Sequence, residues 1–414
     1  MKTLAEWLEF IERQHPKAIA LGLDRVSALL ERMRIELSCP VITVAGTNGK
    51  GSTCALLDAM LRAGGYRTAL YTSPHLVRYN ERVLIAGLEA ADGALTEAFE
   101  TVEAARGDTP LTYFEYGTLG ALWLFTREKV DVAVLEVGLG GRLDAVNVVD
   151  ADCAVLTSVG IDHVDYLGPD RESIGREKAG IFRAGRPAVI AEPQPPQSVL
   201  AAPGVQLLLG RDFGYADQKM QWSYWGPGGK RGGLAHPALR GAMQLRNASA
   251  AICALDCLRE KLPLGMQDIR RGLAEVALPA RFQVLPGRPQ VILDVAHNPQ
   301  AAQVLAENLA TSGFAPETIA VCGMLRDKDI AGVLRILAPR ITRWHMASLP
   351  GPRAASAEEL ARHVEGAQCF VSPGAAFDAA LSRANEDDKI VVFGSFLTVG
   401  EVMGWLKNNK TSKR

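Results

Sequence analysis

The stretch GTNGKGS (Gly46 to Ser52) combines the residue types that bind phosphate groups, namely glycines, one Lys and hydroxyl side chains. In the common phosphate loop, four residues separate the first Gly from the Gly-Lys pair, and Ser or Thr follows the Lys directly. Here only two residues separate them, and Gly51 is inserted between Lys50 and Ser52. The residue types therefore favour phosphate binding, while the spacing indicates a loop that differs from the common one.

A strand and a helix are predicted on either side of this loop. The apolar run Val41 to Ala45 predicts the strand, and Lys50 to Ala63 predicts the helix. Backbone N–H groups and the helix N-terminus would converge on an anion there, with the Lys50 ammonium as a mobile charge. The hydroxyl of Ser52 or Thr53 would be available to Mg²⁺. A Gly-rich turn with an incidental Lys is the alternative, and the complete strand, loop and helix favour phosphate binding.

Three further polar side chains follow predicted strands: Ser73, Glu136 and His163. The strands are Thr68 to Tyr71, Val130 to Val137 and Cys153 to Ser158. Because ligands bind at the carboxyl ends of parallel strands, these side chains could gather at one edge as oxygen and nitrogen ligands of Mg²⁺. For each residue alone a structural role is an equal alternative. Their joint position beside a phosphate loop favours function.

Two other segments carry polar residues that could contribute to a ligand site. RESIGREKAGIF (Arg171 to Phe182) predicts a helix whose charges could simply face solvent, and Lys178 lies on it. A Lys near two Mg²⁺ ions would be repelled unless it were modified or bound an anion. DVAHNP (Asp294 to Pro299) ends a later strand, so Asp294 and His297 are expected at the corresponding edge of a second sheet. The sequence thus predicts polar groups on both sides of a cleft between two domains, which is a preferred ligand site.

Strand-like and helical runs alternate along most of the chain, which is typical of parallel sheets with helical crossovers. At 414 residues the chain is expected to form two domains. Pro279 to Gln290, with three Pro and one Gly, predicts the connector. Pro203 to Arg240, rich in Gly, Pro and aromatic residues, predicts hairpins or loops, and Gln244 to Arg259 predicts a helix. The predicted fold class is α/β, with a larger domain at 1–284 and a smaller doubly wound domain at 285–414.

Composition argues against several classes of protein. The formal net charge is −1, and the segment Trp222 to Gly233 offers only two basic residues among its aromatics, so no nucleic-acid partner is expected. No apolar run approaches the roughly 18 residues of a membrane helix, so the sequence predicts a cytoplasmic protein with no membrane partner. The seven Cys include no Cys-x-x-Cys pair and indicate neither a disulfide framework nor a zinc site. Cys253 and Cys257 are expected to be buried packing thiols.

Motifs over nearly the whole chain resemble those of the bacterial dihydrofolate synthase/folylpolyglutamate synthase family of Mur-ligase-like ATP-dependent amide ligases. In the first domain they are LGLDRV (Leu21 to Val26), GTNGKGS, SPHLVRYNER (Ser73 to Arg82), TYFE (Thr112 to Glu115), EVGLGGRLDA (Glu136 to Ala145), GIDHVDYLG (Gly160 to Gly168) and EKAGIF (Glu177 to Phe182). PARF (Pro279 to Phe282), DVAHNP, GMLRDKD (Gly323 to Asp329) and FGSF (Phe393 to Phe396) continue them. The resemblance implies a P-loop-type ATPase domain of Mur-ligase type and a Rossmann-like second domain. It also accounts for the altered loop, since these amide ligases bind ATP without the standard spacing.

The resemblance implies roles for individual residues. The implied ATP contacts are Thr47, Asn48, Gly49, Lys50, Gly51, Ser52, Asn247, Arg281 and Asp294. The implied ligands of two Mg²⁺ ions are Ser52, Ser73, Glu136, His163 and Lys178. Lys178 matches a family lysine that is carbamylated, and a carbamate is an anion able to bind Mg²⁺. Lys50, Lys178 and His163 are accordingly the predicted catalytic residues.

The implied substrates are dihydropteroate, reduced folates, L-glutamate and ATP. The expected contacts of the pterin-bearing substrate are Ile19, Ala20, Leu21, Thr112, Tyr113, Phe114, Glu115, Leu143, Asp144 and Ala145. Position 20 is Ala where some relatives carry an acidic residue. ATP would phosphorylate the substrate carboxylate, and glutamate would attack the acyl phosphate. Closure of the domains would exclude water from this intermediate. A monomer is expected, because the cleft is complete within one chain.

Three alternatives remain at the level of the sequence. A folylpolyglutamate synthase that adds only later glutamates shares the same motifs. A Mur-type ligase for nucleotide-sugar substrates would need a further N-terminal domain, and only about forty residues precede the phosphate loop here. A nucleotide switch without ligation would give the second domain no purpose, and the sequence has no Asn-Lys-x-Asp stretch for reading a guanine base.

Overall fold

The computed structural model describes residues 2–17 and 19–411. The chain forms two compact units. Unit 1 comprises Met1–Ala238 and Leu245–Val276, and unit 2 comprises Leu239–Gln244 and Ala277–Arg414. Each unit is α/β with a sheet that is mostly parallel, which confirms the predicted fold class. The division into domains at 1–284 and 285–414 stays a prediction.

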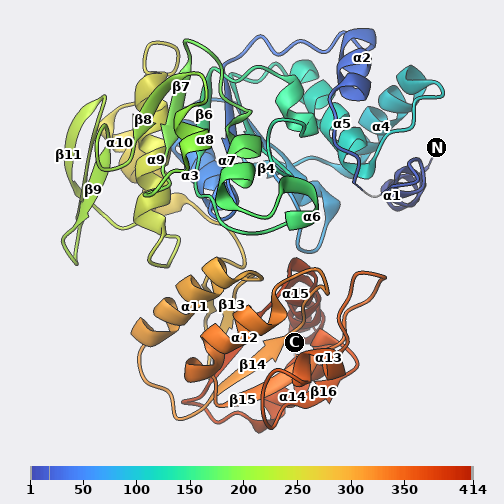
Figure 1. The fold of residues 1–414 in the computed structure, drawn as a ribbon, viewed down its shortest axis with the longest axis vertical. Coiled ribbons are helices and arrows are strands. Elements are labelled where there is room, and N and C mark those ends of the chain that lie inside the picture. Colours follow the sequence, from blue (N-terminus) through green and yellow to red (C-terminus); the bar gives the residue numbers. More distant parts are fainter. Residues whose placement is uncertain (1, 18, 412–414) are drawn as a thin grey trace. The chain divides into compact units, whose positions relative to one another are not determined.

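An eight-stranded sheet lies at the centre of unit 1, in the order β4-β3-β2-β5-β1-β6-β7-β8 (Figure 1). The strands from β2 to β8 in that order run parallel, and β3 and β4 add an antiparallel edge. Their bounds are β1 Val41–Ala45, β2 Thr68–Tyr71, β3 Val83–Ile85, β4 Leu88–Glu89, β5 Val132–Glu136, β6 Cys153–Leu156, β7 Pro187–Ile190 and β8 Val205–Leu208. Every residue of β1 and β5 is buried, as expected for strands covered on both faces.

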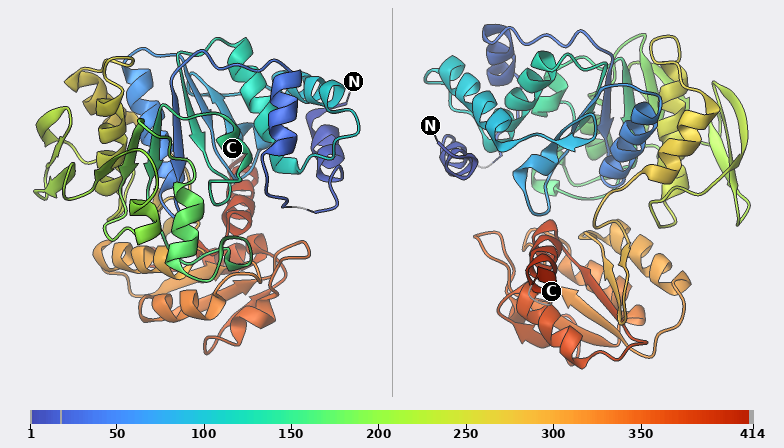
Figure 2. Two further views of the ribbon diagram at one scale, coloured as in Figure 1. Left: turned by 45° about the horizontal axis from the view of Figure 1, so that its top comes forward. Right: turned by 180° about the vertical axis from the view of Figure 1, so that it is seen from behind.

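Helices and short 3₁₀ turns surround this sheet (Figure 2). They are α1 Leu4–Glu12, α2 Asp24–Arg32, α3 Lys50–Ala63, η1 Tyr79–Arg82, α4 Asp92–Arg106, α5 Tyr113–Arg127, η2 Ala145–Val148, α6 Val164–Leu167, α7 Arg171–Ala179, α8 Gln197–Leu200, α9 Gln244–Cys257 and α10 Met266–Glu275. One apolar core joins α1, α2, α4 and α5, with Trp7, Val26, Phe99 and Phe125 among its members. A second core, with Ile174 of α7, lies on β6 and β7.

The predicted helix Lys50 to Ala63 has the same bounds in the structure, as α3. Gly272 of α10 lets this helix pack closely against α3, because a Cβ built at Gly272 would lie 2.5 Å from the Cα of Met60. Such close packing fixes α3, and therefore the loop at its N-terminus, against the rest of unit 1.

The Gly-rich segment predicted as hairpins or loops forms a three-stranded antiparallel sheet, with β9 Gly214–Asp217, β10 Trp222–Gly226 and β11 Gly229–Leu234. It is fastened to α9 through the buried carboxylate of Asp256. Tyr224 donates its hydroxyl to Asp256 at 2.7 Å, and Arg231 forms an ion pair with the same carboxylate. The aromatic and basic residues of this segment therefore serve packing and ion pairing within the unit.

Unit 2 is built on a six-stranded sheet in the order β12-β13-β17-β14-β15-β16, parallel except for β12. The strands are β12 Gln283–Leu285, β13 Gln290–Leu293, β14 Thr318–Cys322, β15 Arg343–Ala347, β16 Gln368–Phe370 and β17 Lys389–Phe393. The helices are α11 Pro299–Thr311, α12 Ile330–Leu337, η3 Ala338–Arg340, α13 Ala357–Ala361, α14 Pro373–Arg383 and α15 Phe396–Thr411. An apolar core lies between this sheet and its helices and includes Ile292, Leu305, Ala320, Cys322 and Val391.

Two sequence predictions need correction. Pro279 to Gln290 is more than a connector, because Gln283–Leu285 pairs antiparallel with β13. Proline at positions 286 and 289 does not prevent this, since the pairing lies at the sheet edge and Gly287 turns the chain with a φ of 134°. Of the two predicted packing thiols, Cys253 is buried, whereas Cys257 at the end of α9 is only half-buried.

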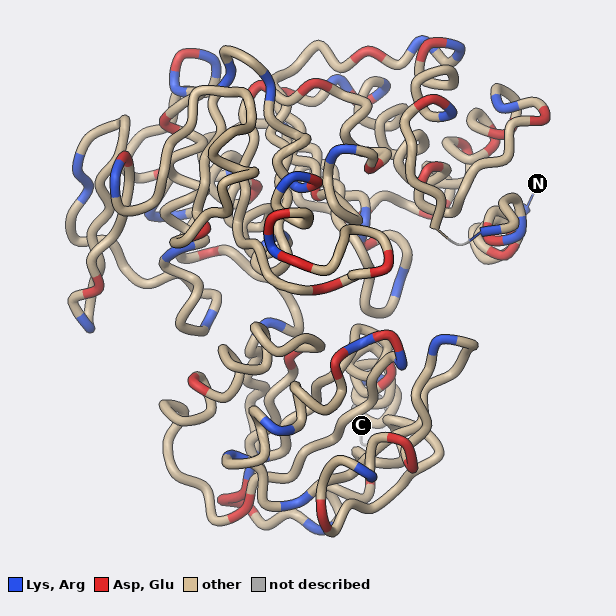
Figure 3. Tube along the Cα trace, in the orientation of Figure 1, with Lys and Arg blue, Asp and Glu red and all other residues tan. Residues whose placement is uncertain are grey.

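Within the described part of the chain, the helices are too short or too polar to cross a bilayer. Acidic and basic residues are interspersed in both units (Figure 3), in keeping with the formal net charge of −1.

Candidate active site

The phosphate loop follows β1 and depends on two glycines. A Cβ at Gly46 would lie 1.8 Å from the Thr157 hydroxyl oxygen, so the loop can pass β6 only without a side chain there. Gly49 has a φ of 87° and a Cβ at this position would lie 2.8 Å from the Asn247 Oδ1. Both the left-handed backbone and the close approach of Asn247 therefore require glycine.

The loop after β6 holds the phosphate loop in place. Thr47 N–H donates to the Ser158 carbonyl at 2.9 Å, and Asn48 N–H donates to the Ser158 hydroxyl at 2.9 Å. The Thr157 hydroxyl donates to the Asn48 carbonyl at 2.6 Å, and Gly160 N–H donates to the Thr47 hydroxyl at 2.9 Å. The side chains and amides of the loop are thus pre-arranged rather than left to form on binding.

Lys50 and the start of α3 provide the positive charge. The Lys50 ammonium donates to the Gly46 carbonyl at 3.0 Å, so the side chain curls over the loop. Gly49 is the N-cap of α3, and as a glycine it has no side chain that could satisfy the first amides of the helix. Amides and ammonium together form an anion-binding site at a helix N-terminus.

Ser73 and Glu136 meet at the next strand ends. Ser73 N–H donates to Glu136 Oε2 at 3.3 Å, and Glu136 is buried. Among the described residues, no group of three His, Cys, Asp or Glu has metal-binding geometry. The predicted set contains one carboxylate, one imidazole, two hydroxyls and the amine of Lys178. The oxygen and imidazole ligands fit Mg²⁺, which usually completes its shell with water and nucleotide phosphates, whereas the amine would fit only as a carbamate.

Lys178 and Asp144 bring buried charge to the same edge. Lys178 is 4 % exposed, and burial together with the charge of Lys50 lowers its pKa to about 7, although Asp162 and Asp144 act in the opposite direction. Burial also raises the pKa of Asp144 to about 7, against the opposing hydrogen bonds from Leu139 and Val146 N–H. The helix that carries Lys178 thus has a buried face, which its charge-rich sequence did not indicate.

A cavity of about 220 Å³ opens beside these groups. Nine of the ten predicted substrate contacts line it: Ile19, Ala20, Leu21, Thr112, Phe114, Glu115, Leu143, Asp144 and Ala145. Tyr113 does not, and instead packs edge-on against Tyr79. Ser73 and His163 line the same cavity, which joins the predicted metal ligands to the predicted substrate contacts.

An ion pair shapes the mouth of this cavity. Arg25 donates to Glu115 at 2.8 Å and to the Ala20 carbonyl at 2.8 Å. Glu115 also accepts the N–H of Thr112 at 2.8 Å as part of the cap of α5. Arg25 therefore ties the loop at Ile19 to Gly22 to the start of α5, a contact that spans ninety positions in sequence.

Sequence reasoning missed several lining residues, of which Arg82 is the most polar. Its Nε donates to His75 Nδ1 at 2.8 Å, and burial with this neighbouring charge lowers the pKa of His75 to about 4. His75 is thus a hydrogen-bonding residue. The motif SPHLVRYNER held the signal for Arg82, since it contains both residues. Gly138 was also missed, and a Cβ there would lie 2.6 Å from the Phe114 ring.

The remaining predicted ATP contacts belong to different units. Asn247 lies in unit 1, whereas Arg281 and Asp294 lie in unit 2. Asp294 accepts the N–H groups of Phe282 and Ala296, each at 2.8 Å, and burial raises its pKa while Arg281 acts to lower it. Arg281 lies over the Phe396 ring at 5.1 Å.

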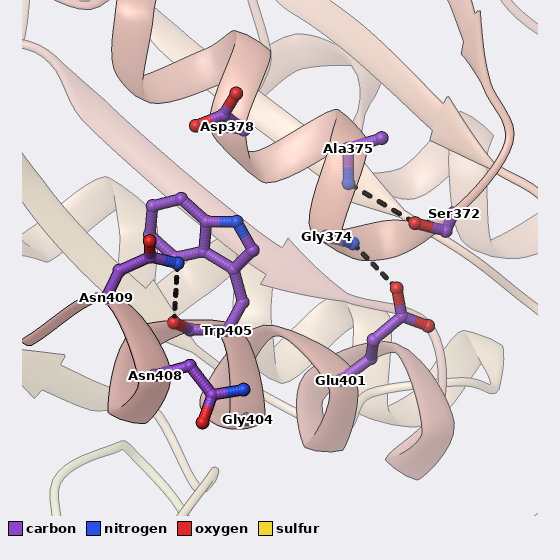
Figure 4. Close-up of a pocket in the computed structure, with 9 residues that line it drawn as sticks. All are labelled: Ser372, Gly374, Ala375, Asp378, Glu401, Gly404, Trp405, Asn408 and Asn409. Atoms are coloured by element: carbon purple, nitrogen blue, oxygen red, sulfur yellow. Dashed lines mark hydrogen bonds between the residues drawn. The ribbon is translucent and has the colours of Figure 1, made fainter. Parts of the chain in front are cut away.

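Unit 2 has a larger groove, of about 720 Å³, between α14 and α15 (Figure 4). Its walls include Asp378, Glu401 and Trp405, and Glu401 accepts the Gly374 N–H at 2.9 Å. None of the predicted site residues lines it. Size alone therefore does not identify the candidate active site, whereas convergent polar groups of shifted pKa do.

Comparison with known proteins agrees with this geometry. Residues 44–197 match the Mur ligase middle domain, and residues 280–396 match the Mur ligase glutamate ligase domain. The dihydrofolate synthase/folylpolyglutamate synthase of Escherichia coli K12 is 47 % identical over 405 residues, covering 97 % of this chain and 94 % of its own length. The chain belongs to the dihydrofolate synthase/folylpolyglutamate synthase family. The family member of Haemophilus influenzae is 41 % identical, with 96 % of each chain covered.

Solved structures of this family share the fold. Escherichia coli FolC in complex with DHPP and ADP superposes with a TM-score of 0.95 at 45 % identity, with 99 % of each chain covered. A bifunctional folylpolyglutamate synthase/dihydrofolate synthase with Mn, AMPPNP and L-glutamate bound gives a TM-score of 0.92 at 45 % identity, with 98 % of each chain covered. The second of these proteins thus binds a nucleotide analogue together with a divalent metal ion.

Proposed function

We propose that this chain is an ATP-dependent ligase that joins L-glutamate to dihydropteroate, giving dihydrofolate, and to reduced folates, extending their glutamate tail. One observation carries the proposal: the cavity and the phosphate loop open at the same sheet edge, with Ser73 and His163 in the cavity wall. A carboxylate held in the cavity would therefore lie beside the terminal phosphate of a nucleotide on α3. The names of the relatives support the choice of substrates.

The substrate end of the site would bind and orient a pterin. Apolar groups of Ile19, Leu143 and Phe114 supply the walls, and Phe114 is itself stacked with Tyr71 at 5.9 Å. Asp144 supplies a buried carboxyl group able to hydrogen-bond a ring nitrogen or amine. This arrangement would aim the benzoate carboxylate of the substrate toward Ser73.

The nucleotide end would hold ATP by the amides of Gly49 to Ser52 at the start of α3 and by the Lys50 ammonium. Thr47, Asn48, Asn247, Arg281 and Asp294 would be further contacts. Two Mg²⁺ ions, when bound, would neutralise charge on the transferring phosphoryl group. Ser52, Ser73, Glu136, His163 and Lys178 would hold them. Lys178 would serve as a carbamate, formed when its neutral amine adds to CO₂ with loss of one proton, which turns a repelled cation into an anionic ligand.

The chemistry then follows in two steps. A carboxylate oxygen of the substrate attacks the γ-phosphorus, the bond to the ADP oxygen breaks, and an acyl phosphate forms. The glutamate amine attacks the acyl carbon, the C–O bond to phosphate breaks, and the nitrogen loses a proton. Pre-arranged amides around the phosphates stabilise charge that develops in the first step.

Release of phosphate by the purified chain tests the proposal. With ATP, Mg²⁺ and glutamate, turnover is expected with dihydropteroate and with a reduced monoglutamyl folate, and each should require glutamate. Turnover with the folate alone would restrict the function to the addition of glutamate to folates that already carry one. ATP hydrolysis that ignores both acceptors would overturn the ligase and favour a nucleotide switch. The proposal also includes that the protein acts as a monomer in the cytoplasm. Light scattering, which measures the molar mass in solution, tests the oligomeric state.

A further inference from the structure

Arg246, in the first turn of α9, is a buried Arg whose guanidinium has an unsatisfied donor. The residue is 8 % exposed, and within the described structure its Nε has no hydrogen-bond partner. Guanidinium stays protonated in proteins, so it cannot relieve burial by losing its charge. Buried polar groups in folded proteins are hydrogen-bonded with few exceptions. A ligand that supplies an acceptor atom would satisfy this donor.

The anionic side chain that acts on Arg246 is already engaged. Burial lowers the pKa of Arg246, whereas Glu192 and, after it, Tyr215 act to raise it. Glu192 accepts the Val159 N–H at 2.9 Å and Arg171 Nη2 at 3.1 Å, and also the Gln194 N–H at 3.2 Å. These donors occupy both carboxylate oxygens. Glu192 gives Arg246 a favourable field but does not accept a hydrogen bond from its Nε.

The sheet order places Arg246 on a definite side of the phosphate loop. The loop follows β1, and β5 and β2, which lead to Glu136 and Ser73, lie on one side of it. β6 and β7 lie on the other side, and Glu192 follows β7. Since Arg246 is near Glu192, it lies on the flank away from Ser73 and Glu136.

The neighbouring residue connects Arg246 to the loop itself. Asn247 comes within 2.8 Å of a Cβ built at Gly49, so the first turn of α9 touches the start of α3. A nucleotide whose phosphates bind at α3 and whose terminal phosphate points to Ser73 and Glu136 must extend its nucleoside in the opposite direction. That direction leads past Asn247 toward Arg246, Glu192 and Tyr215.

We propose that Arg246 binds the nucleoside part of the nucleotide, donating hydrogen bonds from its guanidinium to acceptor atoms of the purine or the ribose. This inference rests on the proposed ATP-dependent function. It adds a binding residue that the motifs did not indicate. It also explains why a guanidinium with an unsatisfied Nε is tolerated in unit 1, since a bound ligand would supply the acceptor.

The test replaces Arg246 with Met, which keeps the length of the side chain and removes charge and donors. Calorimetry would measure the binding of ADP and of tripolyphosphate, which lacks a nucleoside, and a thermal scan would measure Tm without ligand. We expect ADP binding to weaken by about tenfold or more and tripolyphosphate binding to stay unchanged. The Tm of the free chain should stay the same or rise, because a buried charge with an unsatisfied donor is removed. R246K keeps the charge but not the planar guanidinium group, so its affinity for ADP should lie between those of R246M and the unmodified protein.

Arg270 on α10 is exposed and provides the matched control, so R270M should behave as the unchanged chain. Unchanged ADP binding in R246M would overturn the inference, as would an equal loss for both ligands. A lower Tm with normal ADP binding would make Arg246 a structural residue. If the unmodified protein bound tripolyphosphate but not ADP, the proposal that Arg246 binds the nucleoside would be wrong. If it bound neither, the ligase proposal itself would fail.

Discussion

The two sheets of this protein carry different kinds of polar groups at the carboxyl ends of their parallel strands. In unit 1 the edge gathers charges that oppose one another or lack a partner: Lys50 and Lys178 repel, and Arg246 has an unsatisfied Nε. In unit 2 the polar groups at the edge bond to one another. The Ser395 and Thr398 hydroxyls lie 2.8 Å apart, and Thr398 donates to the Gly323 carbonyl at 2.7 Å.

This difference separates ligand binding from fold stability. Polar groups that satisfy one another stabilise the unit that contains them, whereas repelling buried charges cost stability unless a ligand compensates them. The edge of unit 1 is therefore arranged for an anion with metal ions, and substitutions there should change activity more than stability. Substitutions at the edge of unit 2 that touch only internal bonds should show the reverse.

The largest effect is expected at Lys50. K50M removes the charge that curls over the phosphate loop, and turnover should fall by about a thousandfold, as for loss of a charge at a transferring phosphoryl group. Phosphate release measures it, and the exposed Lys230 of β11 supplies the control K230M. A K50M enzyme with near-normal turnover would break the assignment of the loop.

Lys178 should come next. K178A removes the proposed carbamate, and turnover should fall by about a hundredfold, the upper end of effects seen when a metal site loses a supporting group. Isotopically labelled bicarbonate should give a carbamate signal by NMR in the unchanged chain and no such signal in K178A. Loss of turnover without any carbamate signal in the unchanged chain would leave Lys178 as a cationic residue and would refute the modification.

Arg25 should show a smaller and more selective effect. R25M frees the loop at Ile19 to Gly22 from Glu115, so KM for dihydropteroate should rise by about tenfold while kcat changes little. Initial rates at varied dihydropteroate and saturating ATP measure the split. A fall in kcat with constant KM would mean that the ion pair supports phosphoryl transfer rather than substrate binding.

Thr398 tests the opposite side of the comparison. T398V leaves the Gly323 carbonyl without its donor and removes the contact between the two hydroxyls, while the N–H of residue 398 still donates to the Ser395 hydroxyl. The free energy of unfolding should therefore fall by about 1–3 kcal/mol. ADP binding should not change. Denaturant unfolding measures the loss, with exposed Ser382 of α14 as the control S382A. A stable T398V chain that binds ADP poorly would contradict the division between the two edges.

Local sequence predicted the elements of the site well. The apolar run before Gly46 and the glycines at 49 and 64 marked the strand and α3, and the structure reproduces both bounds. β12 was missed because its three residues lie among prolines, where a strand forms only through pairing with β13. Such pairing is tertiary, so no local pattern reveals it.

The candidate site was harder to predict, because it depends on contacts distant in sequence. The cavity joins segments near positions 20, 113 and 144, which only the family resemblance brought together. The helix of Lys178 has the charge of a solvent-facing helix, and only the fold shows that this Lys is buried. Arg246 gave no signal at all, since an Arg in a helix is usually solvated.

The central claim is that the edge of unit 1 transfers a phosphoryl group to a carboxylate. It can be tested directly with dihydropteroate labelled with heavy oxygen in both carboxylate positions, followed by mass analysis of the released phosphate. An acyl phosphate intermediate predicts that each phosphate carries one labelled oxygen and that the other remains in the new amide. Unlabelled phosphate from a reaction that forms the amide would contradict the mechanism.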